Sequence, residues 1–175
     1  KPHETRIQMS THGASIPIQY DDGRMCGNII YMSDVVETIE RSRHRQDGVR
    51  YYEMVKTYTA TFAIAFCEAT TKSIARIWMS GKVFADYRDG LSPFYPVGDS
   101  GLALANLQTS IARGESFFSI YDGAETQLAD PAIVAILGSA DSPTYRGICY
   151  LVFVDFPIGE FAGIPTIEIE LADRI

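Results

Sequence analysis

Residues Tyr51 to Cys67 read YYEMVKTYTATFAIAFC, and the predicted fold rests on the pattern in this segment. Large apolar side chains occupy every second position, small or polar ones lie between them, and only Lys56 interrupts the apolar row. The large side chains are those of Tyr52, Met54, Tyr58, Phe62, Ile64 and Phe66. A period of two residues is typical of a β-strand. We therefore predict one long strand with its heavy side in the core and its light side closely covered or half-exposed.

Two hairpins are expected around this strand. The β-rich residues 27–36 precede it, and the charged residues 37–50 lie between the two runs, so we predict a hairpin whose tip is the charged loop. After the strand, residues 73–79 and 82–85 flank Ser80-Gly81. Glycine supplies the positive φ that a two-residue turn needs, which predicts a second hairpin there.

The rest of the chain shows two helix signals and three further strands. Residues 100–113 have apolar side chains at helical spacing, with Ser100 as the N-cap. Asp130-Pro131 and Gly138 bracket a short second helix. The further strands are expected at residues 117–121, 147–156 and 166–171, and the expected core also includes Trp78, Val152 and Phe153. The sequence thus predicts a mainly β (α+β) protein, antiparallel, with long hairpins and one or two short helices.

Length and composition indicate one globular domain. The 175 residues are 46% hydrophobic and 21% charged, enough to bury a core. No apolar run approaches the roughly 20 residues of a membrane span, and no signal-like segment is visible, so we expect neither membrane crossing nor secretion. Residues 1–88 hold 12 Lys+Arg against 10 Asp+Glu and residues 89–175 hold 3 against 12, so the halves carry +2 and −9. The acidic half argues against nucleic-acid binding.

The cysteines and histidines do not have the spacing of a metal site. Cys26, Cys67 and Cys149 are widely separated and odd in number, so we expect buried reduced thiols. The histidines, at positions 3, 12 and 44, form no His-Glu-x-x-His pair, and no glycine-rich phosphate-binding motif occurs. The sequence therefore predicts neither a metal nor a cofactor.

Two features are compatible with a hydrolase. Gly98-Asp99-Ser100-Gly101 resembles the sequence around the nucleophile of trypsin-like proteases, and histidines and aspartates precede it in the required order. Leu102 follows where that family has a further glycine, and a helix N-cap accounts for Ser100. Carboxylates of the second half could supply a glycosidase acid and base. They are Asp122, Glu125, Asp130, Asp155 and Glu160. We expect no catalytic residue and keep a hydrolase as the alternative.

One basic cluster stands out, with Arg41, Arg43, Arg45 and Arg50 around His44. One interpretation is a solvated hairpin tip that keeps strand ends unpaired. The other is a contact with an acidic protein surface, such as the acidic half of a neighbouring copy, which makes the first three arginines candidate subunit contacts. Nucleic acid is disfavoured because no aromatic residues interleave the cluster.

Three segments of the second half form a recognisable series: residues 121–131 (YDGAETQLADP), 145–153 (YRGICYLVF) and 161–165 (FAGIP). The series resembles the central tail-tip, host-attachment protein J family of long-tailed bacteriophages and the related large hub protein of gene transfer agents. That family runs roughly Tyr-x-Gly-Thr-Glu-Asp-Gln-x-Pro-Asp-Pro, a short helix, Ala-Tyr-Arg-Gly-x-x-Tyr-x-Val-Phe, and then Ile-Pro. The matching motif residues are Tyr121, Gly123, Glu125, Gln127, Asp130, Pro131, Tyr145, Arg146 and Gly147.

The first half agrees with the same family in order. Residues 13–18, 27–30, 62–68 and 74–82 resemble its opening segment, long strand and next hairpin. The departures are Ala124, Thr126 and Ala129 for the usual Thr, Asp and Pro, Ala69 for a common Gly, and an apparent insertion across residues 89–116. Nearly the whole chain is covered by the resemblance.

The resemblance implies a single β-rich hub module, residues 1–175, cut from a larger multidomain tail protein. It comprises a hairpin-rich half (1–88), the insertion (89–116) and a motif-bearing half (117–175). The implied function is structural: part of a phage or phage-like tail-tip baseplate hub that links the tail tube to the receptor-binding apparatus. The implied location is the virion tail tip, after synthesis in the bacterial host cytoplasm. Implied partners are further copies in a homotrimer, the distal tail and other hub proteins, and the tape-measure protein, with no nucleic acid or membrane span required.

The motif also has a physical interpretation that needs no family. Asp122-Gly123 closes a turn, Glu125 and Gln127 can bond backbone groups, and Asp130-Pro131 starts a helix. These are devices that fix a shape, and none of them requires a substrate.

Overall fold

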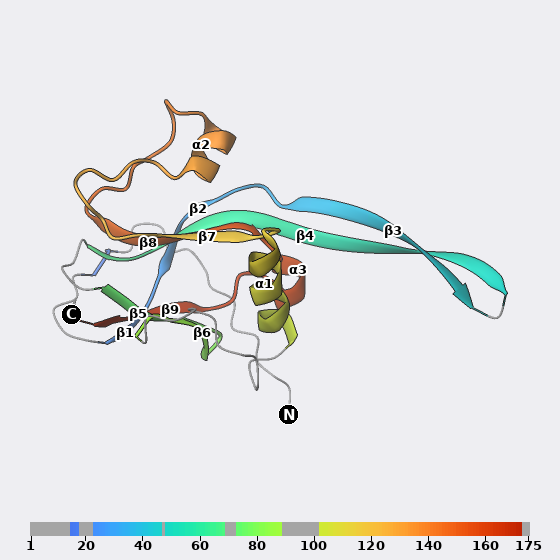
Figure 1. Cartoon of the computed structure of the whole chain (residues 1–175). Helices are drawn as coiled ribbons and strands as arrows, with labels where there is room; N and C mark the ends of the chain where they lie inside the picture. Colours follow the sequence, from blue (N-terminus) through green and yellow to red (C-terminus); the bar gives the residue numbers. More distant parts are fainter. Residues whose placement is uncertain (1–14, 18–22, 47, 69–72, 89–101, 173–175) are drawn as a thin grey trace.

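Two antiparallel sheets and three short helices make up the computed structural model, which describes residues 15–17, 23–46, 48–68, 73–88 and 102–172 (Figure 1). The first sheet has the order β1 (Arg24–Cys26), β9 (Ile167–Ala172), β5 (Ser73–Met79), β6 (Lys82–Asp86). The second has the order β2 (Asn28–Met32), β4 (Val49–Glu68), β8 (Ile148–Phe156), β7 (Phe117–Tyr121), and β3 (Val36–Gln46) pairs with the far half of β4. The helices are α1 (Leu102–Arg113), α2 (Pro131–Leu137) and α3 (Ile158–Phe161). The predicted mainly β class is confirmed.

The core lies between the two sheets and is built on the heavy side of β4. Phe62, Ile64 and Phe66 are fully buried there, as predicted. The Phe62 ring stacks on Phe153 of β8 at 5.3 Å and meets Phe156 edge-on at the same distance. Large aromatic rings in this arrangement contribute both apolar burial and a fixed geometry.

The light side of this half of β4 is covered as well. Ala63 and Ala65 lie in a second buried cluster with Tyr150 and Val152 of β8 and with Ile133 of α2. Small side chains on this side leave room for the helix that crosses it. Both faces of the inner half of β4 are therefore closed.

The charged stretch between the first two runs is a strand and not the loop that we expected. β3 pairs with β4 from Val36↔Thr59 to Gln46↔Val49, and the hairpin turns at Gly48, where φ is 81°. The ladder needs only backbone groups, and the charged side chains are tolerated because both faces of this ribbon meet solvent. Figure 1 shows the β3–β4 hairpin reaching far beyond the two sheets.

Two of the tyrosines expected in the core lie on this hairpin. Tyr52 is 48% exposed and Tyr58 is 37% exposed, so the prediction of their burial is wrong. The reason is the length of the neighbouring strand, since β8 ends at Phe156, opposite Ala60. Beyond that point the same alternation of residues continues without β8 beside it, and Gly159 of α3 lies close to Tyr58.

Several local predictions are confirmed. Ser80 (φ 50°) and Gly81 (φ 79°) form the tight turn between β5 and β6. Asp130 caps α2 with Pro131 in its first turn. Two elements were not predicted from the sequence: α3, and β1, which pairs with β9. None of the described helices is long and apolar enough to cross a membrane.

Candidate functional site

The buried carboxylate of Asp130 is the first anchor of the motif that the sequence singled out. Its Oδ1 accepts hydrogen bonds from the backbone N–H of Ala132 (2.8 Å) and of Ile133 (3.2 Å), and its Oδ2 accepts one from the Tyr121 hydroxyl (2.7 Å). Asp130 is only 2% exposed. One side chain therefore caps α2 and ties that cap to the end of β7.

The second anchor is the side chain of Gln127. Its Oε1 accepts from Gly123 N–H at 2.9 Å, and its Nε2 donates to the carbonyl oxygens of Thr144 and Tyr145, both at 2.9 Å. Arg146 Nε donates to the Gln127 carbonyl at 3.1 Å. Two motif segments that are far apart in the sequence are thus joined by one buried amide.

Glycine is required at the two ends of this junction. Gly147 N–H bonds to the Gly123 carbonyl at 2.9 Å, and the two residues have φ of 78° and 79°. Such positive φ values are strained for any residue with a β-carbon. Tyr145, just before the junction, also has a positive φ of 46°.

Three tyrosine side chains pack together beside the motif. The rings of Tyr121 and Tyr150 stack at 4.5 Å, and Tyr145 meets Tyr150 edge-on at 5.2 Å. The Tyr145 hydroxyl donates to the carbonyl oxygen of Ile30 on β2 at 3.4 Å. Burial, followed by the hydrogen bond to Asp130, raises the pKa of Tyr121 far above its ordinary value, and burial also raises the pKa of Tyr150 and of Tyr145. These hydroxyls therefore stay protonated, and those of Tyr121 and Tyr145 donate hydrogen bonds.

The structure brings together all of the motif residues except Glu125. Gln127 bonds backbone groups, as the sequence suggested, whereas Glu125 is exposed on the loop and the described contacts include no hydrogen bond from it. Tyr150 completes the cluster, and sequence reasoning did not single it out. Its place in the Tyr-Arg-Gly-x-x-Tyr segment was the signal that could have found it.

An open groove runs along the outside of this motif. It encloses about 610 Å³. Its lining residues are Ile120, Tyr121, Asp122, Ala124, Gln127, Leu128, Ala129 and Pro131. Leu128 is 73% exposed, and Asp122 and Glu125 bring negative charge to this loop. The groove, which we call the acidic groove, has mostly apolar walls and one lining carboxylate, Asp122, with Glu125 on the same loop.

The carboxylates weighed for hydrolase chemistry differ in their surroundings. Asp130 is committed to three structural hydrogen bonds, whereas Asp122, Glu125, Asp155 and Glu160 are exposed. Ser100 and its Gly-Asp-Ser-Gly string lie outside the described residues. Among those described, no three His, Cys, Asp or Glu side chains gather as metal ligands.

Of the three cysteines, two follow the prediction of buried thiols. Cys67 and Cys149 are buried and lie opposite each other on β4 and β8. Cys26 is exposed, contrary to our expectation, because it lies on the outer face of β1. Partial burial and a hydrogen bond to Glu168 raise the pKa of the Cys26 thiol.

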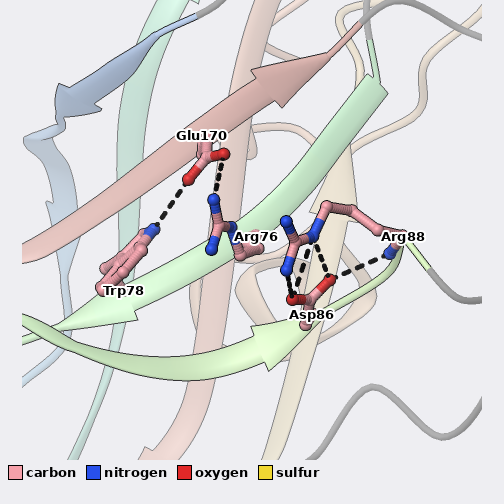
Figure 2. Close-up of polar contacts among 5 residues, drawn as sticks. All are labelled: Arg76, Trp78, Asp86, Arg88 and Glu170. Carbon is pink, nitrogen blue, oxygen red and sulfur yellow. Dashed lines mark hydrogen bonds and ion pairs between the residues drawn. The ribbon is translucent and has the colours of Figure 1, made fainter.

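The outer face of the first sheet carries an ionic network that the sequence did not reveal (Figure 2). Glu170 accepts from Arg76 Nη2 at 2.5 Å and from Trp78 Nε1 at 3.3 Å, while Arg88 pairs with the buried Asp86. The hydrogen bond from Arg76 lowers the pKa of Glu170, and that from Arg88 lowers the pKa of Asp86. Trp78 is half-buried in this network and is not the core residue that we expected.

The basic cluster lies on one face of the β3–β4 hairpin. Residues opposite each other in an antiparallel pair point to the same face. The register pairs Arg41 with Met54, Arg43 with Tyr52, and Arg45 with Arg50. We call this side the arginine face; its residues are Ile39, Arg41, Arg43, Arg45, Arg50, Tyr52, Met54 and Lys56.

Tyr52 organises the centre of the arginine face. The Arg41 guanidinium lies 3.8 Å from the centre of its ring, and Arg43 Nη2 donates to its hydroxyl at 3.1 Å. Glu37 is paired with Lys56. Within the described part of the chain, none of the four arginines pairs with a carboxylate, because Glu40 and Glu53 lie on the opposite face. Positive charge is therefore concentrated on one side.

The fold is similar to that of a chain in a solved virion particle. No protein-family model and no curated protein matches the sequence. A chain from the virion of a native gene transfer agent particle has a similar structure, with a TM-score of 0.54 and 22% identity over 96% of this chain. The two chains share a fold. This chain spans 28% of the length of the virion chain.

Proposed function

We propose that this chain is a structural module of a phage or phage-like tail tip, part of the baseplate hub that links the tail tube to the receptor-binding apparatus. In this role it acts as a homotrimer in the virion and contacts the distal tail protein, other hub proteins and the tape-measure protein. The observation that carries the proposal is the likeness in fold to a gene transfer agent virion chain over 96% of the residues.

The chemistry of the motif supports a structural role. The polar groups of Asp130, Gln127 and Tyr121 form hydrogen bonds with backbone atoms and with each other. Residues in such positions hold a loop in one shape, and an assembly module needs shape more than reactivity. The same part of the chain also resembles the motif of the tail-tip family in the order of its segments.

The proposal is tested on particles. The chain is replaced in its own genome by an epitope-tagged copy, and purified particles are probed with gold-labelled antibody and by quantitative mass spectrometry. We expect label at the tail tip and three copies per particle. Label on the capsid, or absence of the protein from particles, would overturn the proposal.

The same material separates the structural role from a tail-associated hydrolase. Purified chain is incubated with peptidoglycan and with a serine-reactive phosphonate. We expect no cleavage and no labelled serine. Peptidoglycan cleavage, or labelling that is lost in Ser100→Ala, would favour the hydrolase.

A further inference from the structure

The β3–β4 hairpin exposes apolar side chains on both of its faces. Ile39, Tyr52, Met54 and Tyr58 lie on the side that carries the arginines, and Val36, Val49, Tyr51 and Val55 lie on the opposite side. A two-stranded hairpin without further packing is marginally stable, and a contiguous exposed apolar patch marks an interaction site. The hairpin therefore exposes the kind of apolar surface that one partner contributes to an interface.

The acidic groove has the complementary character. Residues 114–145 contain four exposed carboxylates, those of Glu115, Asp122, Glu125 and Asp141, together with the buried Asp130, and no Lys or Arg. Of the exposed ones, Asp122 lines the groove and Glu125 lies on the same loop. Arg146 follows this segment, and its Nε donates to the Gln127 carbonyl. Exposed Leu128 lies in the groove lining with Asp122. The two surfaces therefore carry opposite charges, and both expose apolar side chains.

The two surfaces lie at opposite ends of the same sheet and cannot meet within one chain. The groove begins at Tyr121, which pairs with Tyr150, and Tyr150 pairs with Ala65 of β4. Tyr52 is 13 residues earlier on β4, a separation of roughly 40 Å at the rise of a strand. Figure 1 shows the hairpin pointing away from the end of the sheet that carries α2.

We propose that the arginine face of the hairpin docks on the acidic groove of a second copy of this chain. The contact deepens the proposed function and rests on it, because an assembly module needs a surface through which it assembles. Two different patches meet head to tail, so repetition of the contact closes a ring where the rotation per copy allows it. Charge complementarity favours this occupant, since one chain carries both patches.

Charge exchange between two variants of the 175-residue chain tests the contact. The first variant carries Arg41→Glu, Arg43→Glu and Arg45→Glu, and the second carries Ala124→Lys and Glu125→Arg. The second set leaves Asp122 in place because its Oδ1 accepts from Ala124 N–H. Association is measured by sedimentation velocity at about 50 mM and about 500 mM salt, since exposed charges are screened at the higher value.

We expect each variant alone to associate roughly 10–100-fold more weakly than the parent at low salt, because several exposed ion pairs become repulsive. An equimolar mixture of the two should recover association, since each reversed patch then meets its complement. Arg113→Glu, on the exposed end of α1, is a charge-reversal control outside both surfaces and should leave association unchanged. A parent chain that stays monomeric, or a mixture that shows no recovery, would overturn the proposal.

A photo-cross-link gives a second measurement that needs no charge reversal. Benzoylphenylalanine at position 52 is activated in a mixture of unlabelled and ¹⁵N-labelled chains, and the linked peptides are sequenced. We expect mixed-isotope links to residues 120–131. Links elsewhere, or no links between copies, would contradict the contact. Such a failure leaves the location of the protein in particles untouched, so it is distinguishable from failure of the proposed function.

Discussion

The Tyr121 hydroxyl donates to Asp130 Oδ2 at 2.7 Å, while Oδ1 of the same carboxylate caps α2. This single carboxylate joins a strand end to a helix start. Because both oxygens are used and the group is buried, its removal leaves a hydroxyl and two backbone N–H groups without partners.

Asp130→Ala should lower the free energy of unfolding by about 2–3 kcal/mol, the sum of a lost N-cap and an unsatisfied buried hydroxyl. Asp130→Asn keeps an acceptor oxygen and should recover much of the loss. Urea denaturation measures both variants. Glu125→Ala, an exposed position on the same loop, is the control and should change stability by less than about 0.5 kcal/mol. Equal losses in Asp130→Ala and Glu125→Ala would contradict the anchor role of Asp130.

Alkaline pH should destabilise the fold through Tyr121. Its pKa is raised in the folded state, whereas the unfolded chain ionises near pH 10. The unfolded state thus loses its proton first, so the stabilisation is complete below about pH 10 and declines as pH rises above that value. Thermal melts between about pH 8 and pH 11 measure the decline, and absorbance at 295 nm reports ionisation. Tyr121→Phe should show a shallower decline, and an unchanged slope would mean that other groups cause it.

The boundary of the core on β4 can be tested by two substitutions on one strand. Phe62→Ala removes a fully buried ring and should cost about 3–5 kcal/mol. Met54→Ala, eight residues earlier on the exposed hairpin, should cost less than about 0.5 kcal/mol. Chemical denaturation compares the two. A loss below about 1 kcal/mol for Phe62→Ala would show that the inner half of β4 is not the core strand.

The three thiols should differ in reactivity. Cys26 is exposed, whereas Cys67 and Cys149 are buried between β4 and β8. Iodoacetamide should therefore label Cys26 alone in the native protein and all three after denaturation, as read by peptide mass spectrometry. Because the pKa of the Cys26 thiol is raised, its labelling should be slower than that of a free cysteine at neutral pH. Rapid native labelling of Cys67 would show that the sheet opens at this edge.

The local structure could be predicted from short runs of residues. The period of two from Tyr51 to Cys67 identified a long strand, Ser80-Gly81 marked the turn between β5 and β6, and Asp130-Pro131 marked the start of α2. Each of these features is encoded by neighbouring residues, because alternation, capping and positive φ act over a few positions. The order of the motif segments was visible for the same reason.

Which part of the long strand is buried depends on tertiary packing. Tyr52 and Phe62 share one alternation, yet Tyr52 is exposed and Phe62 is not, because β8 ends opposite Ala60. Period identifies a strand, but burial depends on what packs against it. The charged residues 37–46 resemble a loop in the sequence but form β3, because the backbone of β4 provides their hydrogen-bond partners. Their charged side chains remain solvated on both faces of the hairpin.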